Sequence, residues 1–157
     1  MQRITPFLWF DHQAEEAAKF YCGIFKNSKI TATSRYGDTG PGPKGSVMTC
    51  AFQLDGQEFV ALNGGPVFNF TEAVSFVVNC DDQAELDAYW NKLCDGGQPV
   101  QCGWLKDKYG LSWQIVPKAL SELLSAKDPE RSNRVMAAVM QMTKLDIATL
   151  QKAYDGR

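Results

Sequence analysis

Few side chains in this chain are of the types that perform covalent or metal chemistry. Its 157 residues include one histidine and five cysteines. A catalytic nucleophile needs a neighbouring base, and a metal site needs at least three good ligands in one place. The cysteines are odd in number, are widely spaced and form no C-x-x-C pair, which is typical of reduced thiols in a cytoplasmic protein. They are Cys22, Cys50, Cys80, Cys94 and Cys102.

The single histidine, His12, lies in the turn before the first predicted helix. A solvated or helix-capping role is typical of that position, and proton transfer near neutral pH is the alternative. Cys50 and Cys102 are predicted on apolar strand faces, where a free cysteine acts as a small hydrophobe more often than as a nucleophile. The chain has no second histidine to activate either thiol.

Aromatic rings and neutral hydrogen-bonding groups offer binding rather than catalysis. Strand parity places Ser112, Gln114 and Val116 on one face of a strand and Trp113 on the other. A buried amide needs partners, so Gln114 bonds its neighbours across the sheet or contacts a ligand. For the rings, core packing is the alternative to ligand contact. The ligand-binding candidates are Gln114, Ser75, Asn63, Phe52, Phe59, Trp104 and Arg35.

Arg35 is the one charged candidate in this set. It precedes a loop rich in glycine and proline, at residues 37–43. Its guanidinium could hold an anionic group of a ligand, whereas an exposed strand arginine is the commoner role.

The elements that must position these residues occur twice. A short apolar strand leads to Asp11 and a helix that opens with Gln13-Ala14-Glu15, and later the strand Phe76-Val77-Val78 leads through Asp81 and Asp82 to Gln83-Ala84-Glu85. Each pair is followed by strand-like segments. Two copies are too few for a solenoid. We therefore predict an internally duplicated domain whose two half-sheets share one cleft.

The first copy is predicted to contain four strands and one helix. Asp11 lies where the helix N-cap is expected, residues 14–25 have helical apolar spacing, and Asp55-Gly56 is a strong hairpin signal. The predicted strands are Ile4 to Phe10, Lys29 to Gly37, Ser46 to Leu54 and Glu58 to Leu62.

The second copy repeats this order, and helical patterns follow it. We predict strands at Val74 to Cys80, through Val100, Cys102 and Trp104, and at Leu111 to Val116, with a helix at Gln83 to Cys94. A single domain over residues 1–157 is expected from the length. Its parts are module one at about 4–65, module two at about 73–118, and a C-terminal helical extension at 119–157.

Composition excludes two classes of partner. Hydrophobic residues make up 45% and charged residues 22% of the chain, an ordinary globular balance. The net charge of -2 gives no basic footprint for nucleic acid. Apolar stretches such as Ile4 to Phe10 are far shorter than the roughly 18 residues that would span a bilayer, and the N-terminus has no secretory pattern. We expect no nucleic-acid or membrane partner.

Several segments resemble one superfamily. Pro6-Phe7-Leu8-Trp9-Phe10-Asp11 with Ala14-Glu15-Glu16-Ala17 resembles the opening of the vicinal oxygen chelate proteins, which include glyoxalases, bleomycin-resistance proteins and extradiol dioxygenases. The segment from Trp104 to Pro117 is similar to the signature of the PhnB-like branch, labelled demethylubiquinone 3-methyltransferase-like, and the tail from Arg134 to Ile147 also resembles that branch.

The resemblance implies a fold, an assembly and the places of metal ligands. The fold is α+β, with two βαβββ modules forming a curved mixed sheet around a shared cleft, plus C-terminal helices, and the assembly is a homodimer. Metal-dependent members place His, Glu or Gln on four strands. The matching positions here are Gln114 and Ser75, with no such ligand between Ile4 and Phe10 and Ala61 near the fourth place. We therefore expect no metal and no other cofactor.

Methyl transfer of the common kind needs a glycine-rich loop after the first strand of a parallel sheet. The only glycine-dense loop, at 40–45, carries two prolines. The sequence thus predicts a metal-independent protein that binds a small, partly aromatic or quinone-like molecule. The alternatives are a divalent-metal lyase, dioxygenase or transferase with the ion held by Gln114, Glu58 and waters, and a sequestering, resistance-type binding protein.

Overall fold

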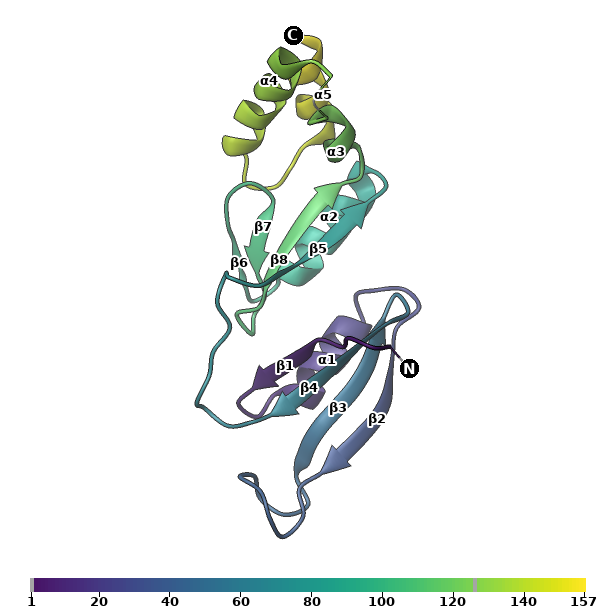
Figure 1. The fold of residues 1–157 in the computed structure, drawn as a ribbon, viewed down its shortest axis with the longest axis vertical. Helices are drawn as coiled ribbons and strands as arrows, with labels where there is room; N and C mark the ends of the chain where they lie inside the picture. The colour runs from purple at the N-terminus through teal and green to yellow at the C-terminus, as the bar shows by residue number, and fades with distance from the viewer. Residues whose placement is uncertain (1, 126) are drawn as a thin grey trace. The chain divides into compact units, whose positions relative to one another are not determined.

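The computed structural model describes residues 2–125 and 127–157, which form two compact units (Figure 1). Unit 1 ends at Phe70 and unit 2 begins at Thr71, at the end of the predicted linker. Each unit holds one four-stranded sheet, with strand orders β1-β4-β3-β2 and β5-β8-β7-β6. The predicted α+β fold with two modules is confirmed. The cleft shared by the two half-sheets and the single-domain organisation stay predictions.

Both units have the element order βαβββ. Unit 1 comprises β1 (Phe7–Phe10), α1 (Ala14–Cys22), β2 (Lys29–Arg35), β3 (Val47–Leu54) and β4 (Gln57–Asn63). Unit 2 comprises β5 (Ser75–Cys80), α2 (Gln83–Cys94), β6 (Gln98–Pro99), β7 (Trp104–Lys106) and β8 (Ser112–Pro117), then α3 (Ala119–Leu123), α4 (Pro129–Met140) and α5 (Ile147–Asp155). In each sheet the first strand pairs in parallel with the last, and the other pairs are antiparallel.

The core of unit 1 lies between α1 and one face of its sheet. Alternation along β3 buries Cys50, Phe52 and Leu54. Phe52 stacks on Tyr21 of α1 and on Phe59 of β4, with ring centroids 6.2 and 5.5 Å apart. Burial of such rings is the main source of stability for this layer.

The N-terminus of α1 is capped from another strand. The prediction that Asp11 serves as the cap is wrong: the residue before the helix is Gln13, whose side chain makes no capping bond. Instead Oδ1 of Asn63, at the end of β4, accepts a hydrogen bond from the backbone N–H of Ala14 at 2.8 Å. Nδ2 of Asn63 donates to the carbonyl of Val47 at 3.0 Å. One amide therefore joins α1, β3 and β4.

The hairpin between β3 and β4 turns where the sequence predicts. Asp55 and Gly56 have φ values of 49° and 81°, the left-handed region that a type I′ turn requires at both central positions. Glycine tolerates this region without steric cost, and aspartate is among the residues that adopt it most readily. The turn fixes the register of the two central strands of unit 1.

In unit 2, α2 covers one face of the second sheet. The side chain of Asp82 caps the helix by accepting from the N–H of Glu85 at 2.8 Å. Leu86 and Leu93 of α2 have no exposed surface, as does Ile115 of β8. The helix bounds, Gln83–Cys94, agree with the periodicity of the sequence because cap and apolar stripe point to the same element.

The segment between β6 and β7 differs from the predicted strand. Cys102 has a φ of 63°, which is incompatible with a strand, so the expectation that Cys102 lies on an apolar strand face is wrong. The N–H groups of Cys102 and Gly103 instead donate to the carbonyls of Met142 and Thr143, each at 2.8 Å. The backbone here holds the C-terminal extension.

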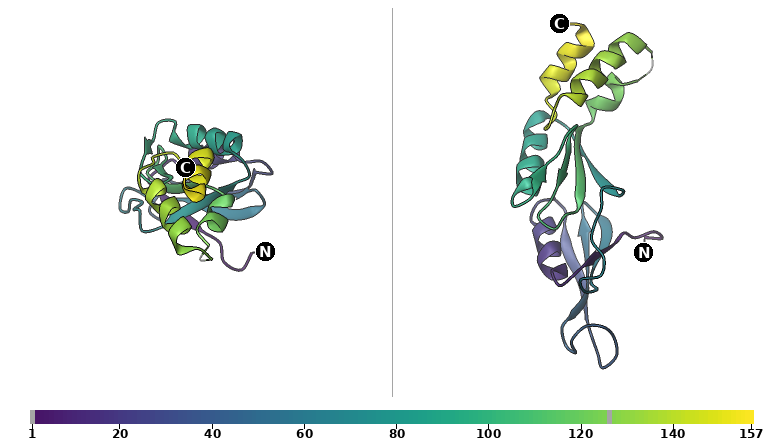
Figure 2. Two further views of the ribbon diagram at one scale, coloured as in Figure 1. Left: turned by 90° about the horizontal axis from the view of Figure 1, so that it is seen from above. Right: turned by 90° about the vertical axis from the view of Figure 1, so that its left-hand side faces the viewer.

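The extension is also bound at the start of α2 (Figure 2). Nε2 of Gln83 donates to the carbonyl of Leu145 at 3.1 Å, and its Oε1 accepts from the N–H of Ile147 at 2.8 Å. Leu145 is fully buried. Within the described ranges, no helix is both long and apolar enough to cross a bilayer.

The turn between β7 and β8 is organised by one buried carboxylate. Asp107 is 3% exposed. Its Oδ1 accepts from the backbone N–H of Tyr109 at 2.9 Å and of Leu111 at 3.1 Å, and its Oδ2 accepts from Nε1 of Trp113 at 2.9 Å. The carboxylate thus ties the turn to the core strand β8.

Substitution Asn63→Ala tests the clamp in unit 1. It leaves the N–H of Ala14 and the carbonyl of Val47 without their side-chain partner, and each such loss costs about 1–3 kcal/mol when the group is buried. We expect the urea midpoint of unit 1 to fall and amide exchange at Ala14 to accelerate. Asn79→Ala, at an exposed position of β5, is the control, and equal stability of the two variants would contradict the clamp.

Substitution Asp107→Asn tests the turn in unit 2. An amide retains one acceptor for the two backbone N–H groups, but its NH₂ faces the N–H of Trp113, a contact between two donors. We expect a loss of about 1–3 kcal/mol in the free energy of unfolding. In the Trp113→Phe background this donor conflict is absent, so the additional cost of Asp107→Asn should shrink. Strict additivity of the two substitutions in a double-mutant cycle would refute the proposed conflict.

Candidate functional site

The second sheet has two chemically different faces. On the face against α2, Leu105, Trp113 and Ile115 are buried. The opposite face, which we call the distal face, carries Ser75 and Val77 of β5, Trp104 and Lys106 of β7, and Ser112 and Gln114 of β8. As strand parity predicts, Gln114 and Trp113 point to opposite faces. The distal face therefore collects three of the predicted ligand-binding residues: Gln114, Ser75 and Trp104.

The side chain of Gln114 is held in a fixed orientation on the distal face. Its Nε2 donates to Oγ of Ser75 at 2.9 Å. Among the described residues, Oε1 of Gln114 has no hydrogen-bond partner in the structure. The amide thus presents an acceptor beside Trp104, its cross-strand neighbour.

Ser112, two residues before Gln114, is the second polar group of this face. It has no exposed surface, and its Oγ has no hydrogen-bond partner among the residues that the structure describes. A buried hydroxyl without a partner is unusual and costs free energy of about 1–3 kcal/mol. The protein's own groups therefore do not complete the hydrogen bonding of the distal face.

An ion pair lies at the end of this face. Nζ of Lys106 contacts Oε1 of Glu72, and both side chains are at least one-third exposed. The hydrogen bond from Lys106 lowers the pKa of Glu72 below its ordinary value. The sequence placed Lys106 at the rim of a cleft, but it gave no sign of Glu72 as its partner, because Glu72 lies in irregular chain before β5.

Phe52 and Phe59, two of the predicted ligand-binding rings, lie in the core of unit 1. They are 1% and 6% exposed and stack on each other on the side of the sheet that packs against α1. This position corrects the prediction of ligand contact, since both rings already face each other and Tyr21. Their types alone could not decide between core and binding site.

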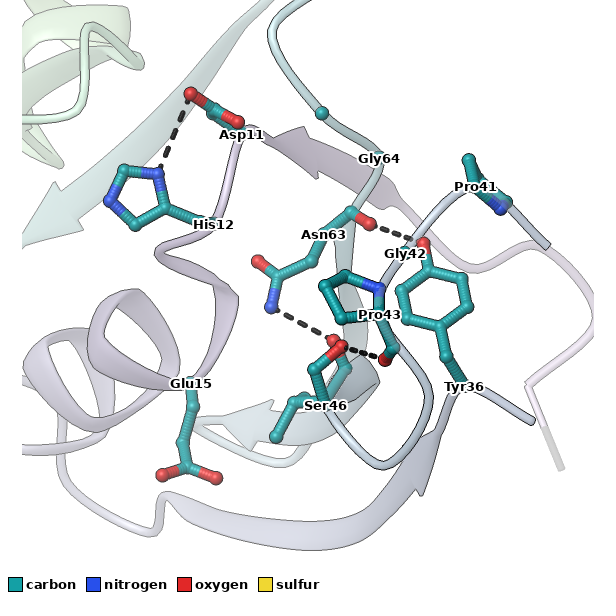
Figure 3. A pocket seen from close by; sticks show the side chains of 12 residues that line it. Asp11, His12, Glu15, Tyr36, Pro41, Gly42, Pro43, Ser46, Asn63 and Gly64 are labelled. Carbon is teal, nitrogen blue, oxygen red and sulfur yellow. Dashed lines mark hydrogen bonds and ion pairs between the residues drawn. The ribbon is translucent and has the colours of Figure 1, made fainter. Parts of the chain in front are cut away.

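Asn63 and Arg35 also belong to unit 1. Asn63 lines a cavity of about 500 Å³ together with Tyr36 and the loop after β2 (Figure 3). Arg35 is exposed, and its Nη1 donates to the carbonyl of Gly45 at 3.1 Å, across the base of that loop. Binding of an anionic group by Arg35 stays a prediction.

The residues at the superfamily's metal positions do not form a donor set that fits a divalent ion. Gln114 and Ser75 offer an amide and a hydroxyl, and these bond to each other. Ala61 is fully buried, and Oε2 of Glu58 accepts from the backbone N–H of Gln2 at 3.1 Å. Over residues 2–125 and 127–157, no three His, Cys, Asp or Glu side chains cluster closely enough to hold a metal.

The cysteines and His12 are not arranged for nucleophilic or acid–base chemistry. Burial raises the pKa of the Cys50 thiol and raises that of Cys80 to about 12, so both are protonated at neutral pH. Nδ1 of His12 lies 3.5 Å from Oδ2 of Asp11, and both side chains are largely exposed. This arrangement agrees with a solvated histidine.

Solved structures of other proteins share this fold. The PhnB protein from Bacillus cereus is 40% identical, with a TM-score of 0.68 over 74% of this chain and 99% of that one. Protein PA1353 from Pseudomonas aeruginosa is 21% identical, with a TM-score of 0.60 over 74% and 96%. The fosfomycin resistance protein FosX from Listeria monocytogenes is 15% identical, with a TM-score of 0.57 over 80% and 98%, and shows the fold alone.

A comparison with curated proteins gave no match. The family model described as 3-demethylubiquinone-9 3-methyltransferase matches residues 2–116, which include both sheets and the segment from Trp104 that resembles the PhnB-like signature. The chain therefore belongs to this family, the PhnB-like branch of the vicinal oxygen chelate superfamily.

Proposed function

We propose that the protein binds a small, partly aromatic, quinone-like molecule on the distal face of the second sheet, without a metal ion held by its side chains. The observation that carries the proposal is the fixed amide of Gln114, whose Nε2 is engaged by Ser75 while Oε1 is left beside Trp104. A polar group that is held in place and lacks a partner is typical of a ligand-reading residue.

The donors and acceptors of the distal face suit a hydroxylated quinone. Oε1 of Gln114 accepts a hydrogen bond, and the hydroxyl of Ser112, which lacks a protein partner, can donate one. A hydroxyquinone carries a hydroxyl donor and carbonyl acceptors on one flat ring. Trp104 supplies an aromatic surface and Val77, which is 50% exposed, an apolar one.

The family description supports the same class of ligand. It names a demethylated ubiquinone, which is a quinone with a free hydroxyl group, as the molecule on which that enzyme acts. It also names methyl transfer. After β1, however, the chain continues through residues 11–13 into α1 without a glycine, so the cradle that the common methyltransferases use for their nucleotide cofactor does not form there. The proposal therefore covers binding, and it assigns no methyl transfer.

Calorimetric titration with a short-chain ubiquinone and with its singly demethylated, hydroxylated analogue tests the proposal. We expect the hydroxylated analogue to bind more tightly, because it alone can donate to Gln114. Gln114→Ala should weaken its binding about tenfold, the equivalent of ~1.4 kcal/mol, and bring the two affinities together. Gln101→Ala, at an exposed position outside the distal face, is the matched control.

Two further measurements separate the alternatives. Binding that persists in a chelator, and that added Ni²⁺, Mn²⁺ or Zn²⁺ does not strengthen, supports a metal-independent site, whereas binding only with metal would contradict it. Mass spectrometry of the recovered ligand distinguishes a sequestering protein, which returns it unchanged, from an enzyme. The absence of saturable binding by either quinone would reject the proposal.

We also propose that the protein is a homodimer, as its superfamily resemblance implies. Strands β1 and β5 each end their own sheet and have one strand partner there, and an unpaired edge is suited to association with another chain. We expect sedimentation velocity at micromolar concentration to give twice the monomer mass. A single species of monomer mass would contradict the proposal.

A further inference from the structure

The cavity in unit 1 is built around one buried tyrosine. Tyr36 is 6% exposed, and its hydroxyl donates to the backbone carbonyl of Asn63. A Cβ on Gly42 would lie 2.2 Å from the Tyr36 ring, so the loop after β2 packs directly on the ring because this position is glycine. The backbone bonds between Tyr36 and Ser46 and between Gly45 and Tyr36, at 2.9 and 2.8 Å, close the base of the loop. The tyrosine wall is therefore preformed.

The neutral polar side chains that line the cavity have already used their donors. Besides Tyr36, the hydroxyl of Ser46 donates to the carbonyl of Pro43 at 2.6 Å, and Nδ2 of Asn63 donates to the carbonyl of Val47 at 3.0 Å. The hydroxyl oxygens keep lone pairs that can still accept. Figure 3 shows these bonds running within the protein around the cavity. The lining is thus poor in free donors and rich in acceptors.

Two carboxylates complete the lining, Asp11 before α1 and Glu15 in its first turn. The nearest cation to Asp11 is His12, at 3.5 Å. Glu15 pairs with Lys19 at 3.2 Å, an exposed pair of the kind that contributes little free energy. Neither carboxylate is therefore neutralised by a strong, buried partner, and both are accessible to a cationic ligand.

The rest of the lining is apolar and small. Pro41, Pro43 and Val47 form it together with the Tyr36 ring and the backbone of Gly64 and Gly65. Gly64 and Gly65 donate their N–H groups to the carbonyls of Phe10 and Asp11, at 2.8 and 3.2 Å. The volume of about 500 Å³ is in the range of sites for small molecules.

We infer that this cavity is a second ligand site, distinct from the distal face, and that it takes a small organic ammonium ion with a short aromatic or apolar body. The ammonium group donates to the carboxylates of Asp11 and Glu15 and to the hydroxyl lone pairs. The body of the ligand packs against Tyr36 and the two prolines. A neutral or anionic ligand of the same shape meets acceptors without offering donors, so the charge of the ligand decides its affinity.

Titration of the full chain with benzylamine and with benzyl alcohol tests this inference, because the two probes have nearly the same shape and differ in charge. We expect benzylamine to bind at least about tenfold more tightly than the alcohol. Asp11→Asn and Glu15→Gln should each weaken benzylamine binding by about threefold to tenfold. Neither side chain takes part in a printed backbone hydrogen bond of the fold, so unchanged circular dichroism and thermal unfolding are expected for both variants.

Glu16→Gln is the matched control. It removes the same charge one residue further along α1, from a side chain that does not line the cavity. Benzylamine affinity within about twofold of the wild type is expected for it. A loss equal to that of Glu15→Gln would show a long-range charge effect and would overturn the inference, as would equal affinity for the two probes or no benzylamine binding.

The test is independent of the proposed quinone site. Gln114→Ala should leave benzylamine binding intact, and Asp11→Asn should leave quinone binding intact. Amide chemical shifts on benzylamine addition should change at Gly64 and Gly65, next to the cavity, and should stay constant at Ser75 and Gln114. Shifts confined to the distal face would assign the amine to the quinone site and would overturn the inference.

Discussion

The parallel pairing between the first and last strands of each module is the constraint from which the rest of the structure follows. Two strands that run in the same direction cannot be joined by a tight turn, so a helix must cross over one face of the sheet between them. In unit 1 this helix is α1 and in unit 2 it is α2. One face of each sheet is thereby committed to core packing, and polar side chains that could meet a ligand belong on the other face.

The two modules reach the same topology with different local chemistry. The helix of unit 2 is capped within its own sequence by Asp82, whereas the helix of unit 1 is capped by Asn63 from the last strand of the module. The first solution depends on local sequence alone. The second makes the start of α1 depend on the completed sheet, and it places the same asparagine at the wall of a cavity. Stability and the shape of a candidate site are therefore coupled in unit 1.

Much of the fold, and less of the sites, can be predicted from sequence. Alternation and helical spacing are local, so they predict α2, the Asp55-Gly56 hairpin and the parity of Gln114. Phe52 and Phe59 were misassigned because a ring on a strand fits a core and a ligand site equally well. The cap of α1 and the contacts of Cys102 were missed because their partners, Asn63 and Met142, are distant in sequence. Tyr36 gave no signal, since its burial depends on how the following loop folds.

The way the C-terminal extension is attached bears on how such a protein could evolve. The family model ends at residue 116, before α3, α4 and α5. The extension is held by backbone groups of Cys102 and Gly103 and by the amide of Gln83, none of which lies on the distal face. Acquisition of these helices by an ancestral two-module protein would therefore have required no change in the groups that contact a ligand, and the appendage and the binding chemistry could diversify separately.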